Sequence, residues 1–255
     1  MWVLLTATVT PQVDESLRVV DPEVRRAQYR AAIFRWWELC RDEKLTLVIG
    51  ENSGEDLPGL VQSALGFRPP EIHLVNTTQP STSVVSRGKG ATEGLLIRDV
   101  VDALGSESDG EFLFKCTGRL FVKNFRQCMS RMPSNDSNSR VVFADIPRSK
   151  FEWIDSRFFG ASLAVWRQEF RDLGSLSNDS AGINFENELA HAINLAAAGG
   201  PITVKTMSEK PWIVGQSGTT GERYAVGVPS LLKRHLLRPA DQLRRRLDDI
   251  YTGYK

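Results

Sequence analysis

The stretch Phe112-Leu-Phe-Lys-Cys-Thr-Gly-Arg119 decides the fold that we expect. A short apolar run, typical of a buried strand, gives way to two cations, a hydroxyl and a glycine (Lys115, Thr117, Gly118 and Arg119). Open α/β sheets bind their ligands at the carboxyl ends of strands. Lys and Arg suit phosphate, and glycine allows close backbone approach. The stretch therefore predicts an anion site at the end of a central strand. A solvated turn between a strand and a helix is the alternative.

Composition limits the class of protein. The chain has 255 residues, 41% hydrophobic and 25% charged, with a formal charge of +1, which fits one soluble domain and gives no reason to expect nucleic-acid binding. Its three cysteines and three histidines are scattered, so we expect no disulfide framework and no metal site. A reducing cytoplasm fits best. We see neither a membrane span nor a signal peptide.

Strands and helices alternate along the first part of the sequence. We expect strands at 2–9, 45–49, 71–75, 112–116, 141–144 and 202–206, and helices at 22–40, 56–65, 91–104, 120–132, 164–173 and 185–198. The glycine-rich segment 212–224 is expected to lack regular structure. The alternation predicts an α/β fold, a single Rossmann-like domain over residues 1–228 whose mostly parallel central sheet is flanked by helices.

The C-terminal segment 229–255 differs in charge from the rest. It holds seven Lys or Arg and three Asp, a net charge of +4, in two predicted amphipathic helices broken at Pro239. A basic amphipathic tail can make a peripheral contact with an anionic membrane. It can equally dock on the body of the protein or on a second subunit.

The order of these parts, over about residues 2–198, resembles the GT-A fold of nucleotide-sugar glycosyltransferases. The resemblance implies that the first strand and the end of the second hold the nucleobase, which points to Thr6, Thr8, Glu51 and Asn52. It also implies that a helix start, here Lys89-Gly90, lies beside the ribose and the phosphates.

The central strand departs from the pattern of that family. The family carries Asp-x-Asp, which binds a divalent metal, where this chain has Lys115-Cys116-Thr117. These are not the usual ligands of a hard cation. We expect Lys115 and Arg119 to stabilise the leaving diphosphate directly, with Thr117 and Gly118 beside it, so that no metal or other cofactor is obligatory. The alternative is that the register is off by a strand and Lys115 is structural.

The resemblance also implies an acidic helix start near the acceptor, here Phe185-Glu-Asn-Glu188. A carboxylate in a cleft can act as general base, and we prefer Glu186 for this role. Helix capping is the alternative, since an acid in the first turn is favoured by the dipole. Glu188, Arg157 and Phe159 are candidates for the acceptor site, although phenylalanines in strands are usually core residues. Asp155 and Asp179 are weaker candidates.

The segment Gly215–Gly221 could close over the diphosphate as a lid, with Ser217 and Gly218 donating N–H groups. An ordinary surface loop is the alternative.

These features predict a transferase that moves a sugar from a nucleotide-sugar donor to a carbohydrate or lipid-linked acceptor, as in polysaccharide biosynthesis. A non-catalytic module that binds nucleotide sugars is one alternative. A nucleotidyltransferase is another, but such enzymes usually carry a glycine-rich loop after the first strand. Here that strand leads into Thr6-Ala-Thr-Val-Thr-Pro11, which contains no glycine.

Overall fold

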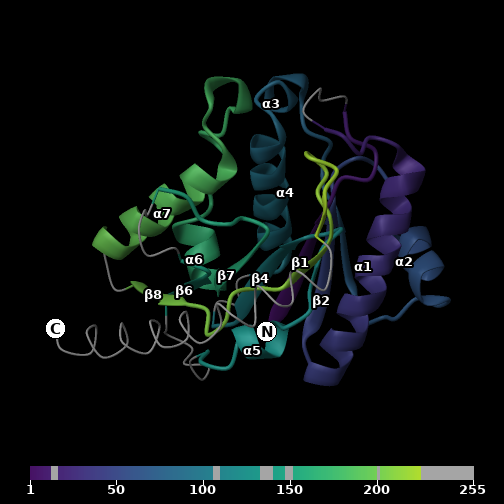
Figure 1. Ribbon diagram of the computed structural model, residues 1–255, viewed down its shortest axis with the longest axis horizontal. Coiled ribbons are helices and arrows are strands. Elements are labelled where there is room, and N and C mark those ends of the chain that lie inside the picture. Colours follow the sequence, from purple (N-terminus) through teal and green to yellow (C-terminus); the bar gives the residue numbers. More distant parts are fainter. Residues whose placement is uncertain (13–16, 106–109, 133–139, 147–151, 200–201, 225–255) are drawn as a thin grey trace.

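The computed structural model describes residues 1–12, 17–105, 110–132, 140–146, 152–199 and 202–224 (Figure 1). The basic tail at 229–255 and the end of the predicted domain at 228 lie outside these ranges, so both stay predictions. Within the described ranges, no helix combines the length and the apolar character needed to cross a membrane.

A seven-stranded sheet forms the centre, in the order β3-β2-β1-β4-β7-β6-β8. Its strands are β1 (Trp2–Ala7), β2 (Thr46–Glu51), β3 (His73–Asn76), β4 (Phe112–Thr117), β6 (Arg140–Ala144), β7 (Phe158–Ser162) and β8 (Ile202–Thr206). Pairing is parallel from β3 to β4 and between β6 and β8, and β7 alone runs against both of its neighbours. The predicted α/β class with a mostly parallel sheet is therefore confirmed.

One face of the sheet is covered by α1 (Pro22–Glu43) and α2 (Leu57–Leu65), at the right of Figure 1. Asp21 caps α1 by accepting hydrogen bonds from the backbone N–H groups of Glu23 and Val24, and proline stands at the first helical position. Trp36 is fully buried in this layer, and its indole Nε1 donates to the carbonyl oxygen of Leu120 at 2.8 Å.

The other face is covered by α4 (Lys89–Ala103), α6 (Leu163–Gln168) and α7 (Phe185–Gly199). Alternation along β4 assigns its side chains to the two layers: Phe112, Phe114 and Cys116 face α1, and Leu113 packs in the layer of α4 and α7. Lys115 follows Leu113 at a spacing of two, so it lies on the α4 side of the sheet.

Two segments differ from the sequence prediction. The helix expected at 120–132 is instead a strand, β5 (Phe121–Val122), and a short helix, α5 (Phe125–Cys128). The segment 212–224, expected to be irregular, contains β9 (Ile213–Gln216) and β10 (Arg223–Tyr224). These strands form a second sheet in the order β10-β9-β5. Strands of two to four residues exist only through pairing with distant partners, which local patterns do not reveal.

Smaller differences concern the ends of elements. The first strand ends at Ala7, α4 begins at Lys89, α6 ends at Gln168, and a short helix, α3 (Thr82–Val85), lies where a loop was expected. The carboxyl ends of β1, β2 and β4 meet at one edge of the sheet because these strands are parallel neighbours. The yellow segment of Figure 1, which is the β9–β10 hairpin, runs between α4 and α1 towards this edge.

Candidate active site

A cavity of about 710 Å³ lies at the carboxyl edge of β1, β2 and β4. Its walls come from the strand ends, from α1, from the first turns of α4 and α7, and from the β9–β10 hairpin. Eleven of the predicted site residues line it: Thr6, Thr8, Asn52, Lys89, Gly90, Thr117, Arg119, Arg157, Glu186, Ser217 and Gly218. Five do not: Glu51, Lys115, Gly118, Phe159 and Glu188.

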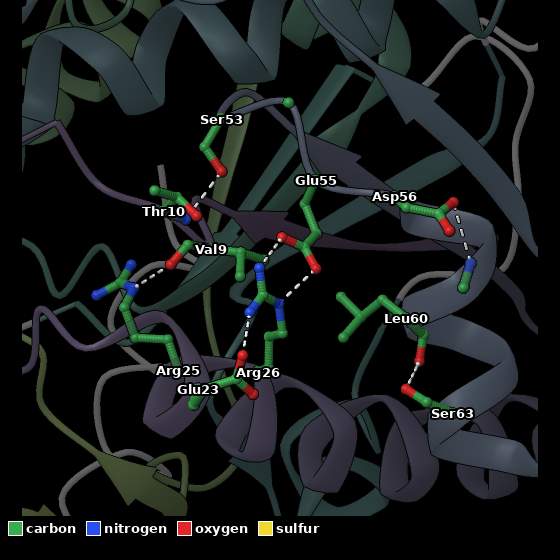
Figure 2. Close-up of polar contacts among 12 residues, drawn as sticks. Val9, Thr10, Glu23, Arg25, Arg26, Ser53, Glu55, Asp56, Leu60 and Ser63 are labelled. Carbon is green, nitrogen blue, oxygen red and sulfur yellow. Dashed lines mark hydrogen bonds and ion pairs between the residues drawn. The ribbon is translucent and has the colours of Figure 1, made fainter.

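The residues predicted for the nucleobase form one wall. The hydroxyl of Thr8 donates to Asn52 Oδ1 at 2.7 Å, which fixes both side chains at the ends of neighbouring strands. The backbone N–H of Thr10 donates to Ser53 Oγ at 3.0 Å (Figure 2). Gln79 donates to the carbonyl oxygen of Ser53 at 3.1 Å. This wall therefore carries amide and hydroxyl groups from three segments.

Glu51 supports the backbone of this wall and does not line the cavity. Its carboxylate accepts hydrogen bonds from the backbone N–H groups of Val9, Ser53, Gly54 and Glu55 at 2.9–3.2 Å, and only 1% of the residue is exposed. Direct contact with a nucleobase, as the resemblance implied, does not fit this position. Glu51 instead shapes the loop that follows β2.

Two arginines without carboxylate partners lie side by side at the cavity wall. Arg25 is 4% exposed and donates to the carbonyl oxygens of Thr8, Val9 and Val19, the second of which Figure 2 shows. Burial lowers the pKa of Arg25, and the positive charge of Arg119 acts in the same direction, whereas Tyr29 and the carboxylate of Glu51 act in the opposite direction. No carboxylate forms an ion pair with Arg25 among the described residues.

Arg119 is 9% exposed, and its Nη1 donates to Gln28 Oε1 at 2.9 Å. Its Nε is buried and has no hydrogen-bond partner within the described residues. Gly218 of the hairpin lies directly over it, because a Cβ at that position would be 2.2 Å from Nη2. Arg119 is thus a confined cation at the cavity wall, and its buried Nε is unpaired within the described residues.

Lys115 is not placed as the sequence predicted. Its side chain is fully buried and does not line the cavity. Its ammonium forms an ion pair with Glu93 Oε1 at 2.7 Å and donates to the carbonyl oxygen of Ser156 at 2.8 Å and to Thr117 Oγ1 at 3.2 Å. An ammonium has three N–H donors, so none remains for a phosphate. The structural role that we held as the alternative fits this geometry better than contact with the diphosphate.

Glu93 is a cavity residue that the sequence analysis missed. It is the fifth residue of α4 and lines the cavity. It accepts a hydrogen bond from Thr6 Oγ1 at 2.8 Å in addition to forming the ion pair with Lys115. A signal was present in the sequence. Gly90, Glu93 and Ile97 share one face of the helix at spacings of three and four, and an acid in that apolar stripe needs a buried partner.

Glu186 lies in the first turn of α7 and lines the cavity. The hydroxyl of Ser156 donates to Glu186 Oε1 at 2.6 Å. Since the carbonyl oxygen of the same Ser156 accepts from Lys115, a continuous chain of polar contacts joins Glu93, Lys115, Ser156 and Glu186. This chain holds two carboxylates at the cavity from two different helices.

Glu188 and Phe159 face away from the cavity. Glu188 accepts from the backbone N–H groups of Gly174 and Leu176 at 2.9 and 3.1 Å and from Ser177 Oγ at 2.7 Å, so its carboxylate anchors the 174–177 segment. Phe159 is fully buried and packs on Trp166 with ring centroids 5.2 Å apart. The acceptor contacts predicted for both residues do not fit these positions.

Gly118 is likewise a packing residue. Its N–H donates to the carbonyl oxygen of Thr6 at 2.9 Å, and a Cβ there would be 2.6 Å from that oxygen. Glycine is required because the backbone passes so close to β1.

Arg157 lines the cavity with its charge already compensated. Asp155 Oδ1 accepts from its backbone N–H at 3.0 Å and from its Nε at 2.8 Å, and this hydrogen-bonded contact raises the pKa of Arg157. The guanidinium lies 4.7 Å from the centre of the Tyr224 ring on β10. Arg157, which directly precedes β7, thus contacts the hairpin through Tyr224.

The 216–221 segment is held over the cavity from two sides. On one side, the carbonyl oxygen of Gly218 accepts from the N–H groups of Arg18 and Val19 at 2.9 and 3.2 Å. On the other, Lys89 Nζ donates to Thr219 Oγ1 at 2.9 Å. The backbone N–H of Lys89 donates to Asp179 Oδ2 at 3.2 Å, so the start of α4 already meets a carboxylate.

The residues at the Asp-x-Asp position do not fit a divalent metal. Lys115 places a positive charge there, and Cys116 points into the α1 layer, where burial raises its pKa to about 12 and keeps the thiol protonated at neutral pH. No group of three His, Cys, Asp or Glu side chains suited to a metal ion occurs in the part of the chain that the structure describes. Hard divalent metals prefer carboxylate and other oxygen ligands, and the one side-chain oxygen at this position, the Thr117 hydroxyl, already accepts a hydrogen bond from Lys115.

Comparison with known proteins adds similarities of fold. No family model matches the sequence, and no curated protein matches it. Among solved structures, 80% of the chain aligns with 73% of the galactosyltransferase LgtC, determined with donor and acceptor sugar analogs, at 9% identity and a TM-score of 0.49. Mouse xyloside xylosyltransferase 1 aligns over 80% of this chain and 84% of its own, at 12% identity and a TM-score of 0.45.

HddC from Yersinia pseudotuberculosis aligns over 84% of this chain and 92% of its own, at 10% identity and a TM-score of 0.46. Two of these three proteins carry glycosyltransferase names, the class that the sequence resembles. With identities near 10% and TM-scores below 0.5, these similarities do not decide an activity.

The Lys115–Glu93 pair gives a prediction about stability. Glu93→Gln leaves a buried ammonium without its counter-charge, and we expect a loss of about 2–3 kcal/mol in the free energy of unfolding. This is below the 3–5 kcal/mol typical of fully buried pairs, since the Glu93 side chain is 24% exposed. Lys115→Met should lower the free energy of unfolding by less, because the Glu93 carboxylate that is left unpaired is still partly exposed to water. Denaturant unfolding measures both.

A double-mutant cycle provides the control. The variant with both Glu93→Gln and Lys115→Met carries no unpaired charge, so its loss should be clearly smaller than the sum of the two single losses. Additive losses would contradict the coupling of the two side chains.

Proposed function

We propose that this chain is a glycosyltransferase that takes a sugar from a nucleotide-sugar donor bound in the cavity. The observation that carries the proposal is the pair Arg25 and Arg119, two buried guanidinium groups that line one cavity and form no ion pair among the described residues. The charge of Glu51 acts on Arg25 from behind the wall, and no carboxylate of the described residues contacts either guanidinium. Like charges in a poorly hydrated site repel each other unless an anion joins them. A diphosphate supplies two or more negative charges, and a guanidinium binds phosphate oxygens in a fixed geometry.

Charge is distributed unevenly around the cavity. Arg25 and Arg119 lie towards α1 and the hairpin, and the carboxylates of Glu93 and Glu186 come from α4 and α7. A ligand that is anionic in one part and rich in hydroxyl groups in another matches this distribution. A nucleotide sugar has this character, with a base for the wall at Thr8 and Asn52.

The residues of the chain suggest how transfer proceeds. The acceptor hydroxyl oxygen forms a bond to the anomeric carbon of the sugar, and the bond from that carbon to the diphosphate oxygen breaks with its electron pair. Glu186, oriented by the Ser156 hydroxyl, receives the proton of the acceptor. Arg119, backed by the charge of Arg25, stabilises the negative charge that develops on the diphosphate. Lys89, whose ammonium donates to Thr219, is a third cation that lines the cavity.

The acceptor in this proposal is a carbohydrate, free or lipid-linked, that enters beside Glu186 and Arg157. The hairpin segment 216–221 acts as a cover that excludes water from the diphosphate. Charge stabilisation by arginine and lysine replaces an obligatory metal ion, because the Lys115–Thr117 position offers no ligand set for one.

Two other functions stay open to the same test. A binding module without turnover would keep the arginine pair and the donor affinity, and would show no transfer. A nucleotidyltransferase would need a sugar phosphate and a nucleoside triphosphate. The segment after β1, which contacts Glu51 and Ser53, carries no glycine-rich phosphate loop.

Arg119→Ala should weaken binding of the nucleoside diphosphate by about 10- to 100-fold, since one charge-assisted hydrogen bond is worth roughly 1.5–3 kcal/mol. Isothermal titration on the purified protein measures it, after thermal shift with a panel of nucleotide sugars has identified the preferred base. Arg126→Ala is the matched control: this arginine pairs with Glu43 on the surface, outside the cavity. Equal affinities of Arg119→Ala and the wild type would contradict the phosphate contact.

Glu186→Gln should lower turnover by about 10²- to 10⁴-fold and leave donor affinity nearly intact, because it removes the basic carboxylate and keeps the shape. Steady-state rates and a donor titration measure the two effects. Glu169→Gln, which breaks an ion pair with Arg140 outside the cavity, serves as control. Near-normal turnover in Glu186→Gln would remove Glu186 from the mechanism.

Transfer should survive an excess of EDTA, because cationic side chains provide the charge that a metal would otherwise supply. The measurement is the rate with and without chelator, followed by addition of Mn²⁺ or Mg²⁺. A manganese-dependent transferase in the same assay shows that the chelator is effective. Loss of activity that either ion restores would contradict a metal-independent mechanism.

A further inference from the structure

We propose that Glu93 is a specificity-determining residue whose carboxylate accepts hydrogen bonds from hydroxyl groups of the donor, on its ribose or on its transferred sugar. The inference rests on the proposed function and adds a contact for the neutral, hydroxyl-bearing part of the ligand. Its observation is a carboxylate at the cavity wall that is bound firmly through one oxygen and open at the other.

Both contacts that Glu93 makes with described side chains use the same oxygen. Oε1 accepts from Thr6 Oγ1 at 2.8 Å and from Lys115 Nζ at 2.7 Å. Oε2 forms no hydrogen bond with the described residues. It is also not among the buried polar atoms that lack a partner. Since the side chain is 24% exposed and lines the cavity, Oε2 is the oxygen that remains available to a ligand.

The carboxylate is held in a fixed orientation. Lys115 is anchored by Glu93 itself and by the oxygens of Ser156 and Thr117, and it is closed off from solvent. Thr6 is held on β1 in register with Thr117 on β4. A group fixed in this way loses little conformational entropy when it binds a ligand, which is the usual benefit of a preorganised contact.

The charge balance indicates the kind of ligand group. Glu93 is already compensated by Lys115, so a cationic ligand is not needed to neutralise it. A phosphate would be repelled by the carboxylate and finds Arg119 elsewhere in the cavity. A hydroxyl group is a neutral donor that forms a strong hydrogen bond to a carboxylate. Glu93 therefore fits the ribose or sugar hydroxyls of a nucleotide sugar.

The test compares affinities for four probes: UDP, UDP-glucose, GDP and GDP-mannose. Glu93→Gln should bind the nucleotide sugar preferred by the wild type about 10- to 100-fold more weakly, since the hydrogen bond to a charged acceptor is lost. A loss for the nucleotide sugar alone assigns the contact to the transferred sugar. An equal loss for the diphosphate assigns it to the ribose.

A second variant separates recognition from folding. Glu93→Gln with Lys115→Met removes both charges of the pair, so no unpaired charge stays buried, and it should show the same loss of affinity. Asp102→Asn is the matched control, because it makes the same change on the same helix and breaks an ion pair with Arg171 outside the cavity. Its affinity should equal that of the wild type. Thermal melts identify temperatures at which all variants are folded, and the affinities are measured there.

Two results would overturn the inference, and they differ in what they imply for the proposed function. If the wild type binds a nucleotide sugar and both Glu93 variants bind it within about two-fold, Glu93 makes no contact with the donor, and the proposed function stands. If the wild type binds no nucleotide sugar of the panel used to identify the preferred base, the proposed function fails, and the assignment of Glu93 fails with it.

Discussion

The ion pair between Lys115 and Glu93 is the contact on which the cavity depends. An ammonium without access to water needs an acceptor for each of its three donors, because an unpaired buried charge is strongly unfavourable. Here the acceptors come from α4, from the end of β4 and from the segment before β7. One side chain thereby fixes three segments that are far apart in the sequence. Ser156 extends the chain of contacts to Glu186 on α7.

Two arginines and two glutamates reach this cavity from opposite faces of the sheet. Arg25 projects from α1, and Arg119 follows β4, and neither has a carboxylate partner among the described residues. Glu93 and Glu186 come from the helices of the other face. The fold thus separates an anion-binding part from a part that accepts hydrogen bonds. The arginine pair carries the proposal of a diphosphate ligand, and this separation extends it to a nucleotide sugar.

The hairpin forms one wall of the cavity, and two glycines allow it to approach Arg119 closely. Gly215 has a φ of +135°, and a Cβ there would be 2.6 Å from the carbonyl oxygen of Arg119. Gly218 approaches the guanidinium of Arg119 more closely than any side chain would permit. The same two residues that favoured an irregular loop in the sequence therefore allow the hairpin to pack directly on Arg119.

The sequence by itself determined the α/β class and the edge of the sheet that carries polar residues, because apolar runs that end in polar residues are local patterns. It also identified Arg119 and Glu186 as cavity residues. Only the tertiary structure decided the direction of Lys115, since the partner that it meets is 22 residues away on α4, and the sequence does not show which helix covers β4. The same reason explains why Glu93 was missed. The strands of the second sheet were missed because they form only by pairing at long range.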